Sequence, residues 1–81
     1  MSKQLLKIDL YHNNEYYELG ILKMGGDWLS ISIGNKNFLW AIIGYTPKPN
    51  KEYDYHFIVN HGMKELETKQ ILDKFTDIMY K

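Results

Sequence analysis

The hydrophobic pattern of this chain changes its period once, and that change most constrains the fold. Over residues 5–11 and 28–33 apolar and polar side chains alternate, which is typical of half-buried strands. From about residue 63 the apolar side chains recur every three or four positions, as they do along one side of a helix. The pattern therefore predicts a set of strands followed by a helix, whose apolar positions are Leu66, Ile71, Leu72, Phe75, Ile78 and Met79.

Short turn sequences separate the predicted strands at residues 12–15, 25–27 and 34–37. Their asparagines and glycines tolerate the left-handed backbone angles of tight hairpins, and turns of this length join antiparallel neighbours. Pro47 and Pro49 place a loop over residues 46–52, because proline cannot donate to a sheet ladder. We expect an α+β fold: a five-stranded antiparallel β-meander followed by one C-terminal amphipathic α-helix packed on one face of the sheet. The predicted strands cover residues 5–12, 16–24, 28–33, 38–45 and 53–60, and the helix covers residues 63–80.

The chain has 81 residues, which is below the usual size of one domain, so we expect a single domain over residues 1–81. Asn60 is the predicted N-cap of the helix, and Thr68 is the alternative cap of a shorter helix. Residues 1–4 lead directly into alternating sequence, so we expect no signal peptide.

Residues 38–45 are apolar at nearly every position, which is unusual for a strand of an antiparallel sheet. Strict alternation places Phe38, Trp40 and Ile42 on one face. It places Leu39, Ala41 and Ile43 on the other face. One helix covers only one of these faces, so either the sheet curls on itself or a second chain covers the other.

The charges of the chain balance, with ten lysines, no arginine and ten acidic residues. Nucleic-acid binders usually carry a net positive charge, and arginine is the usual residue for bidentate phosphate and guanine contacts. Both features count against a nucleic-acid partner. The bias towards Lys, Asn, Ile and Tyr also fits an AT-rich genome.

The absence of cysteine fits a reducing compartment, and no apolar run is long enough to span a membrane. We expect a cytoplasmic protein without a membrane contact.

Neither a metal site nor a catalytic group is indicated. His12, His56 and His61, even with Asp54 added, lack the spacing of known ligand pairs. Ser30 and Ser32 lie outside any nucleophile-elbow motif and are the polar side of a strand. We therefore expect no enzyme, no cofactor and no metal ion.

The seven tyrosines and two tryptophans are the remaining signal, since these residues are enriched in binding surfaces and also form cross-strand pairs within sheets. The favoured function is a small protein–protein interaction module, such as an inhibitor or regulatory protein. A phage or mobile-element inhibitor of a host or defence enzyme is a special case. The alternative is a single-stranded nucleic-acid-binding protein that uses sheet aromatics and lysines. A homodimer through the 38–45 strand is compatible with either. The candidate partner-binding residues are Phe38, Trp40, Ile42, Tyr45, Tyr16, Tyr53 and Trp28.

Overall fold

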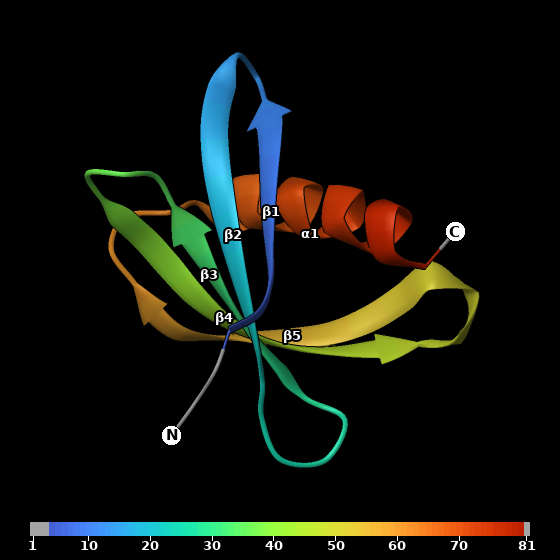
Figure 1. Cartoon of the computed structure of the whole chain (residues 1–81). Helices are drawn as coiled ribbons and strands as arrows, with labels where there is room; N and C mark the ends of the chain where they lie inside the picture. The colour runs from blue at the N-terminus through green and yellow to red at the C-terminus, as the bar shows by residue number, and fades with distance from the viewer. Residues whose placement is uncertain (1–3, 81) are drawn as a thin grey trace.

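The computed structural model describes residues 4–80, and residues 1–3 and 81 of the predicted domain lie outside this range. Five antiparallel strands form one open sheet in the order β1-β2-β3-β4-β5, and one helix follows them (Figure 1). The predicted α+β meander is therefore confirmed. The elements are β1 (Gln4–His12), β2 (Glu15–Lys23), β3 (Leu29–Gly34), β4 (Leu39–Lys48), β5 (Glu52–Asn60) and α1 (Glu65–Met79).

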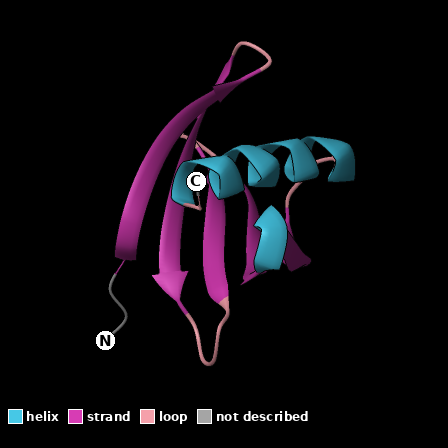
Figure 2. Cartoon of the chain, turned by 90° about the vertical axis from the view of Figure 1, so that its right-hand side faces the viewer, coloured by secondary structure: helices cyan, strands magenta, loops and turns pink. Residues whose placement is uncertain are grey.

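Helix α1 lies across one face of the sheet and leaves the other face without a helix (Figure 2). The sheet twists strongly, so that β1 and β2 stand upright in Figure 1 while β4 and β5 run across the view. Within residues 4–80, no helix combines the length and the apolar character needed to cross a bilayer.

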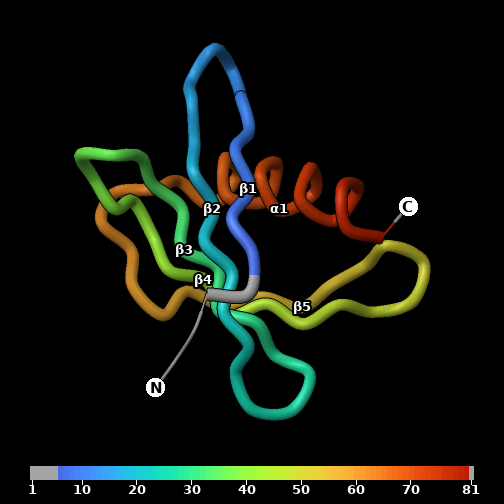
Figure 3. Tube along the Cα trace, in the orientation of Figure 1, coloured from blue at the N-terminus to red at the C-terminus, as the bar shows by residue number. Residues whose placement is uncertain are grey.

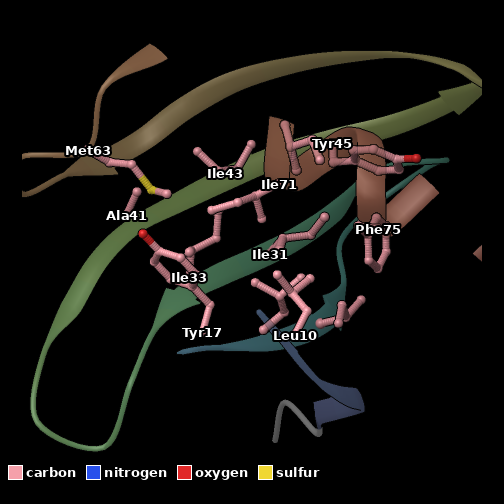
Figure 4. Packing of buried hydrophobic residues seen from close by; sticks show 13 residues of the cluster. Leu10, Tyr17, Ile31, Ile33, Ala41, Ile43, Tyr45, Met63, Ile71 and Phe75 are labelled. Carbon is pink, nitrogen blue, oxygen red and sulfur yellow. The ribbon is translucent and has the colours of Figure 1, made fainter. Parts of the chain in front are cut away.

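The core lies between α1 and the helix-facing side of the sheet (Figure 4). It follows the predicted alternation: Leu19, Ile31 and Ile43 come from three neighbouring strands, and all are fully buried. Burial of each such side chain contributes about 1.5–3 kcal/mol. The buried hydrophobic residues are Leu10, Tyr17, Leu19, Ile21, Ile31, Ile33, Ala41, Ile43, Tyr45, Met63, Ile71, Leu72 and Phe75.

The predicted asparagine turns are present. Asn13 and Asn14 have φ angles of 52° and 65°, so the β1–β2 hairpin uses two left-handed residues in succession. In the β3–β4 turn, the side-chain oxygen of Asn35 accepts hydrogen bonds from the backbone N–H groups of Asn37 and Phe38. Both turns fix the antiparallel pairing of the strands that they join.

The predicted loop over residues 46–52 is much shorter in the structure. β4 continues to Lys48, a 3-10 turn spans Pro49–Lys51, and Glu52 already belongs to β5. Pro47 is paired with Tyr53 of β5, while β3 begins at Leu29 opposite Tyr45 and does not reach Pro47. Proline is tolerated here because this part of β4 is an edge on its β3 side.

The helix begins later than predicted, at Glu65, and its N-cap Lys64 makes no side-chain capping bond. Asn60 is not the N-cap. Its side-chain oxygen instead accepts hydrogen bonds from the N–H groups of Gly62 and Met63, at 3.0 and 2.7 Å. Thr68 is a buried residue within the helix, so it does not cap a shorter one.

A bulge in β4 changes the faces expected for residues 38–43. Ile33 of β3 pairs with Ala41, but the next residue, Gly34, pairs with Leu39, so Trp40 is the extra residue. Leu39 therefore lies on the same face as Ile42, and the prediction that it shares a face with Ala41 is wrong. The reason is that a bulge breaks strict alternation.

A second bulge, in β5, places Val59 and Phe57 on opposite faces of the sheet, although strict alternation would put them on the same face. Ile42 pairs with Val59, whereas Ile43 pairs with Phe57, so Ile58 is the extra residue. Cross-strand partners share a face, so Val59 lies with Ile42 and away from the helix.

Candidate functional site

Four of the tyrosines connect the sheet to the helix through their hydroxyl groups. Tyr17 donates to Glu67 at 2.7 Å, and Tyr55 donates to Glu65 at 2.6 Å. Two candidate partner-binding residues belong to the same set. The Tyr53 hydroxyl lies 2.8 Å from Asp73. The Tyr45 hydroxyl lies 2.8 Å from Thr76, and Figure 4 shows its ring beside Ile71 and Phe75.

Burial raises the pKa values of all four tyrosines, and hydrogen bonds to carboxylates add to this rise in Tyr17, Tyr53 and Tyr55. Burial, with the hydrogen bond and charge of Glu65, raises the pKa of Tyr55 to about 12. The pKa values of Tyr17 and Tyr53 are raised by burial and by the carboxylates of Glu67 and Asp73. Burial also raises the pKa of Tyr45. All four tyrosines are neutral donors that fasten the helix to the sheet.

The face of the sheet opposite α1 is the candidate site, and we call it the open face. Its middle is hollow because β2 and β3 place only glycine or serine at several positions there. One hollow of about 180 Å³ adjoins a second of about 380 Å³, and both are lined by Gly20 and Ser32. We define the open face by Gly20, Leu22, Ser30, Ser32, Leu39 and Ile42.

Apolar side chains from β4 and the preceding turn border these hollows. Phe38 is 45% exposed and Leu39 is 39% exposed, while Ile42 is partly buried. The rings of Phe38 and Trp40 meet edge to face at 4.6 Å. Trp40 packs against the rim of the core. The β4 border of the open face therefore presents exposed apolar side chains, next to the aromatic pair of Phe38 and Trp40.

Trp28 and His56 form a second aromatic contact on the open face, with ring centroids 5.2 Å apart. The imidazole lies directly over Gly44, where an added Cβ would stand 2.4 Å from the His56 Cε1 atom. Gly44 is paired with His56 across the β4–β5 ladder. A glycine at this position leaves room for the ring close to the backbone.

Charged groups occupy the β1–β2 end of the open face. Lys7 and Glu18 border the larger hollow, and their charged atoms are 3.8 Å apart. Tyr16 donates to Glu18 at 3.1 Å, and its ring packs against that of Tyr11 in a tilted arrangement. Partial burial, with hydrogen bonds to Asp9 and Glu18, raises the pKa of Tyr16 to about 12. This end of the face is polar, whereas the β4 border is apolar.

The three histidines lie in different parts of the molecule. His12 is buried against the helix, where its Nε2 atom lies 2.8 Å from Gln70. His56 lies on the open face, and His61 is exposed after β5. Asp54 forms an ion pair with Lys48 at 3.0 Å. In the part of the chain that the structure describes, no three His, Cys, Asp or Glu side chains form a cluster suited to a metal ion.

The structure thus divides the seven candidate residues. Phe38, Ile42, Trp28 and Tyr16 lie on or beside the open face, whereas Trp40 packs against the core and meets the ring of Phe38 edge to face. Tyr45 and Tyr53 belong to the contact with the helix. Residue types alone did not indicate the hollow, although small residues at alternate positions of two adjacent strands are a signal for one. No protein-family model, no curated protein and no solved structure matches this chain.

Proposed function

We propose that this chain is a small protein–protein interaction module, an inhibitor or regulatory protein that acts by binding and not by catalysis, and that its partner docks on the open face. The observation that carries this proposal is an uncovered sheet face on which exposed β4 side chains border a hollow. Such a surface suits a partner that inserts one or two side chains.

The composition of this face supports a protein partner. Interfaces typically combine an apolar or aromatic centre with a polar rim. Here Phe38, Leu39 and Ile42 supply apolar surface along one side of the hollows, and the Lys7–Glu18 ion pair supplies polar groups at the β1–β2 end. The backbone of the hollow is held by strand pairing on both sides, so little conformational entropy is lost when a partner docks.

Tyr45 and Tyr53 are left out of this proposed contact. Tyr45 is fully buried, and the Tyr53 hydroxyl is bound to the helix. Trp28 and Tyr16 extend the proposed contact at its two ends.

A second copy of the chain is one occupant that the same face would accept, as in the homodimer predicted through residues 38–45. Strand β4 lies between β3 and β5, so it offers a partner its face and not an edge. Single-stranded nucleic acid is the other alternative. It is disfavoured because the net charge is zero and the tyrosines on the helix side are engaged with α1.

The proposal is tested by affinity capture from bacterial cytosol with tagged wild type and two variants, Leu39→Lys and Ile42→Lys. The matched control is Leu66→Lys, because Leu66 is an apolar residue on α1 that is 69% exposed. Circular dichroism checks that all four proteins are folded. We expect a protein in near-stoichiometric yield with wild type and Leu66→Lys, and its loss with both open-face variants.

Equal recovery with all four proteins would refute the proposal. Self-association that is lost in Leu39→Lys would identify the second copy as the occupant. A fluorescence titration with an oligonucleotide at low salt tests the remaining alternative, and salt-sensitive binding there would replace a protein partner by a nucleic acid. The identity of a captured protein tests the special case of a host or defence enzyme.

A further inference from the structure

Strand β1 forms one edge of the sheet, and within residues 4–80 it is paired only with β2 (Figure 3). The two-residue turn makes His12 and Glu15 the pair that closes the hairpin. Hydrogen-bonded pairs alternate from there, so Leu10 and Ile8 direct their backbone groups towards β2. The backbone groups of Lys7, Asp9 and Tyr11 point away from the sheet. At Tyr11, the side chain of Lys74 already donates to the outward carbonyl at 2.9 Å.

The side chains at this edge carry opposite charges two residues apart. Lys7 and Asp9 both lie on the open-face side, and Asp9 is directly opposite Glu18 in the β1–β2 ladder. Like charges in opposite positions are unfavourable, and the single lysine beside them is 3.8 Å from Glu18. A further positive charge opposite Asp9 would relieve this repulsion.

We propose that β1 pairs with β1 of a second copy of this chain, antiparallel, with a two-fold axis at Ile8. In this register, Lys7 lies opposite the partner's Asp9, and Asp9 lies opposite the partner's Lys7. Both are hydrogen-bonded positions, so the outward backbone groups of the edge are satisfied in the same arrangement. The pairing joins the two five-stranded sheets into one ten-stranded sheet with both helices on the same side.

Charge selects this register over its neighbours. The backbone groups of Lys7 and Asp9 must face the partner strand, so the register between the two copies can change only in steps of two residues. A shift one way places Lys7 opposite the partner's Lys7, and a shift the other way places Asp9 opposite the partner's Asp9. Both alternatives are repulsive.

The side chains on the helix side fit the same register. Ile8 lies opposite the partner's Ile8, and Leu6 lies opposite the partner's Leu10. Leu6 is 38% exposed and Ile8 is partly buried in one copy, so the pairing removes further apolar surface from water. The other edge, β5, is less suitable because its bulge at Ile58 lies within the strand, whereas the register shift of β1 lies before Leu6, outside the proposed contact.

The first test is sedimentation equilibrium of wild type, Lys7→Asp, Asp9→Lys and an equimolar mixture of the two variants. Each variant alone places like charges opposite each other, and we expect its dimer to be weaker by about tenfold or more. The mixture restores opposite charges at both positions, and we expect it to form a heterodimer. Lys36→Asp, a charge reversal in the exposed β3–β4 turn, is the matched control and keeps the wild-type association.

A wild type that stays monomeric from micromolar concentrations upwards would overturn the proposal. It would also fail if Lys36→Asp were as disruptive as Lys7→Asp, or if the mixture stayed monomeric.

The second test uses the absence of cysteine from the chain. In Ile8→Cys the two introduced thiols face each other at the two-fold axis, at a position where Cα atoms are about 4.5 Å apart and a disulfide fits. Oxidation by copper and air should give a covalent dimer, whereas Ser30→Cys, on the open face, should not. A covalent dimer of Ser30→Cys alone would place the contact on the open face. Leu39→Lys leaves the β1 dimer intact, so failure of the proposed partner site and failure of this dimer are distinguishable.

Discussion

The hydroxyl groups of Tyr45 and Thr76 lie 2.8 Å apart inside the core, where β4 meets α1. Thr76 is also 2.8 Å from the carbonyl oxygen of Leu72 and donates its one proton to that oxygen. Tyr45 is therefore the donor and Thr76 the acceptor in the bond between them.

Because Tyr45 is the donor and Thr76 the acceptor, the substitutions Tyr45→Phe and Thr76→Val should differ in their cost to stability. Tyr45→Phe removes a donor and should cost about 1 kcal/mol of unfolding free energy, whereas Thr76→Val strands a buried hydroxyl and should cost about 2 kcal/mol. The double variant, which has neither group, should be more stable than Thr76→Val alone. Urea unfolding measures all three, and a Tyr45→Phe variant less stable than Thr76→Val would contradict the assignment.

Alkaline pH should unfold the protein through its tyrosines. Tyr16 and Tyr55 have an ordinary pKa of 10.0 when unfolded and about 12 in the folded protein. Their neutral forms stabilise the fold fully below pH 10, and this contribution is lost as the pH rises through about 12. We expect a fall in unfolding free energy over this window, measured by urea titration at each pH.

The Tyr17→Phe variant tests the cause, because it removes one tyrosine whose pKa is raised by burial and by Glu67. Its fall in stability should be shallower than that of wild type. An equally steep fall would mean that other groups govern the alkaline transition.

Two glycines of the sheet should respond differently to alanine. A Cβ at Gly34 would stand 2.4 Å from the backbone carbonyl oxygen of Phe38, whereas a Cβ at Gly44 meets the movable ring of His56. Gly34→Ala should therefore cost about 2–3 kcal/mol and Gly44→Ala about 1 kcal/mol or less. Thermal unfolding ranks the two variants.

The double variant Gly44→Ala/His56→Ala is the control for this explanation. Removal of the ring should abolish most of the cost of the alanine, since the three atoms nearest to the added Cβ all belong to the His56 ring. Equal costs in the presence and absence of His56 would rule out the ring as the cause.

The β1–β2 turn should be improved by glycine. Asn14 has a φ of 65°, which glycine adopts without strain, and Asn-Gly is the preferred pair in such turns. Asn14→Gly should raise the unfolding free energy by about 0.5 kcal/mol, while Asn14→Ala should lower it by about 1 kcal/mol. Chemical denaturation of the three proteins checks the sign, and a stabilising alanine would show that the turn adopts another conformation.

The fold could be predicted from the sequence wherever the hydrophobic pattern was uninterrupted. Ser30 and Ser32 alternate with partly buried Leu29 and buried Ile31 and Ile33, and this alternation predicted the strand and its faces. The change to a helical period predicted α1 and three of its buried residues, Ile71, Leu72 and Phe75, whereas the predicted apolar positions Leu66, Ile78 and Met79 are exposed. Local patterns suffice here because one face of each element is buried against the other.

The sequence failed where long-range geometry decided the outcome. The bulges at Trp40 and Ile58 have no local signal in the chain, yet each moves its neighbours to the other face. Pro47 lies within a strand because β3 ends before it, which only the sheet order reveals. The helix contacts of Tyr45 and Tyr53 depend on residues 31 and 20 positions away. Exposed and buried tyrosines therefore could not be separated by residue type.

The hydrogen bonds between the helix and the sheet join residues that are far apart in the chain, and this matters while the chain is being synthesised. Lys74 is bonded to Tyr11 across 63 positions of the chain, and His12 to Gln70 across 58. The sheet strands leave the ribosome before the helix that covers their apolar face. Until α1 emerges, Leu19, Ile31 and Ile43 stay uncovered, so the incomplete chain exposes apolar surface of the kind that favours aggregation.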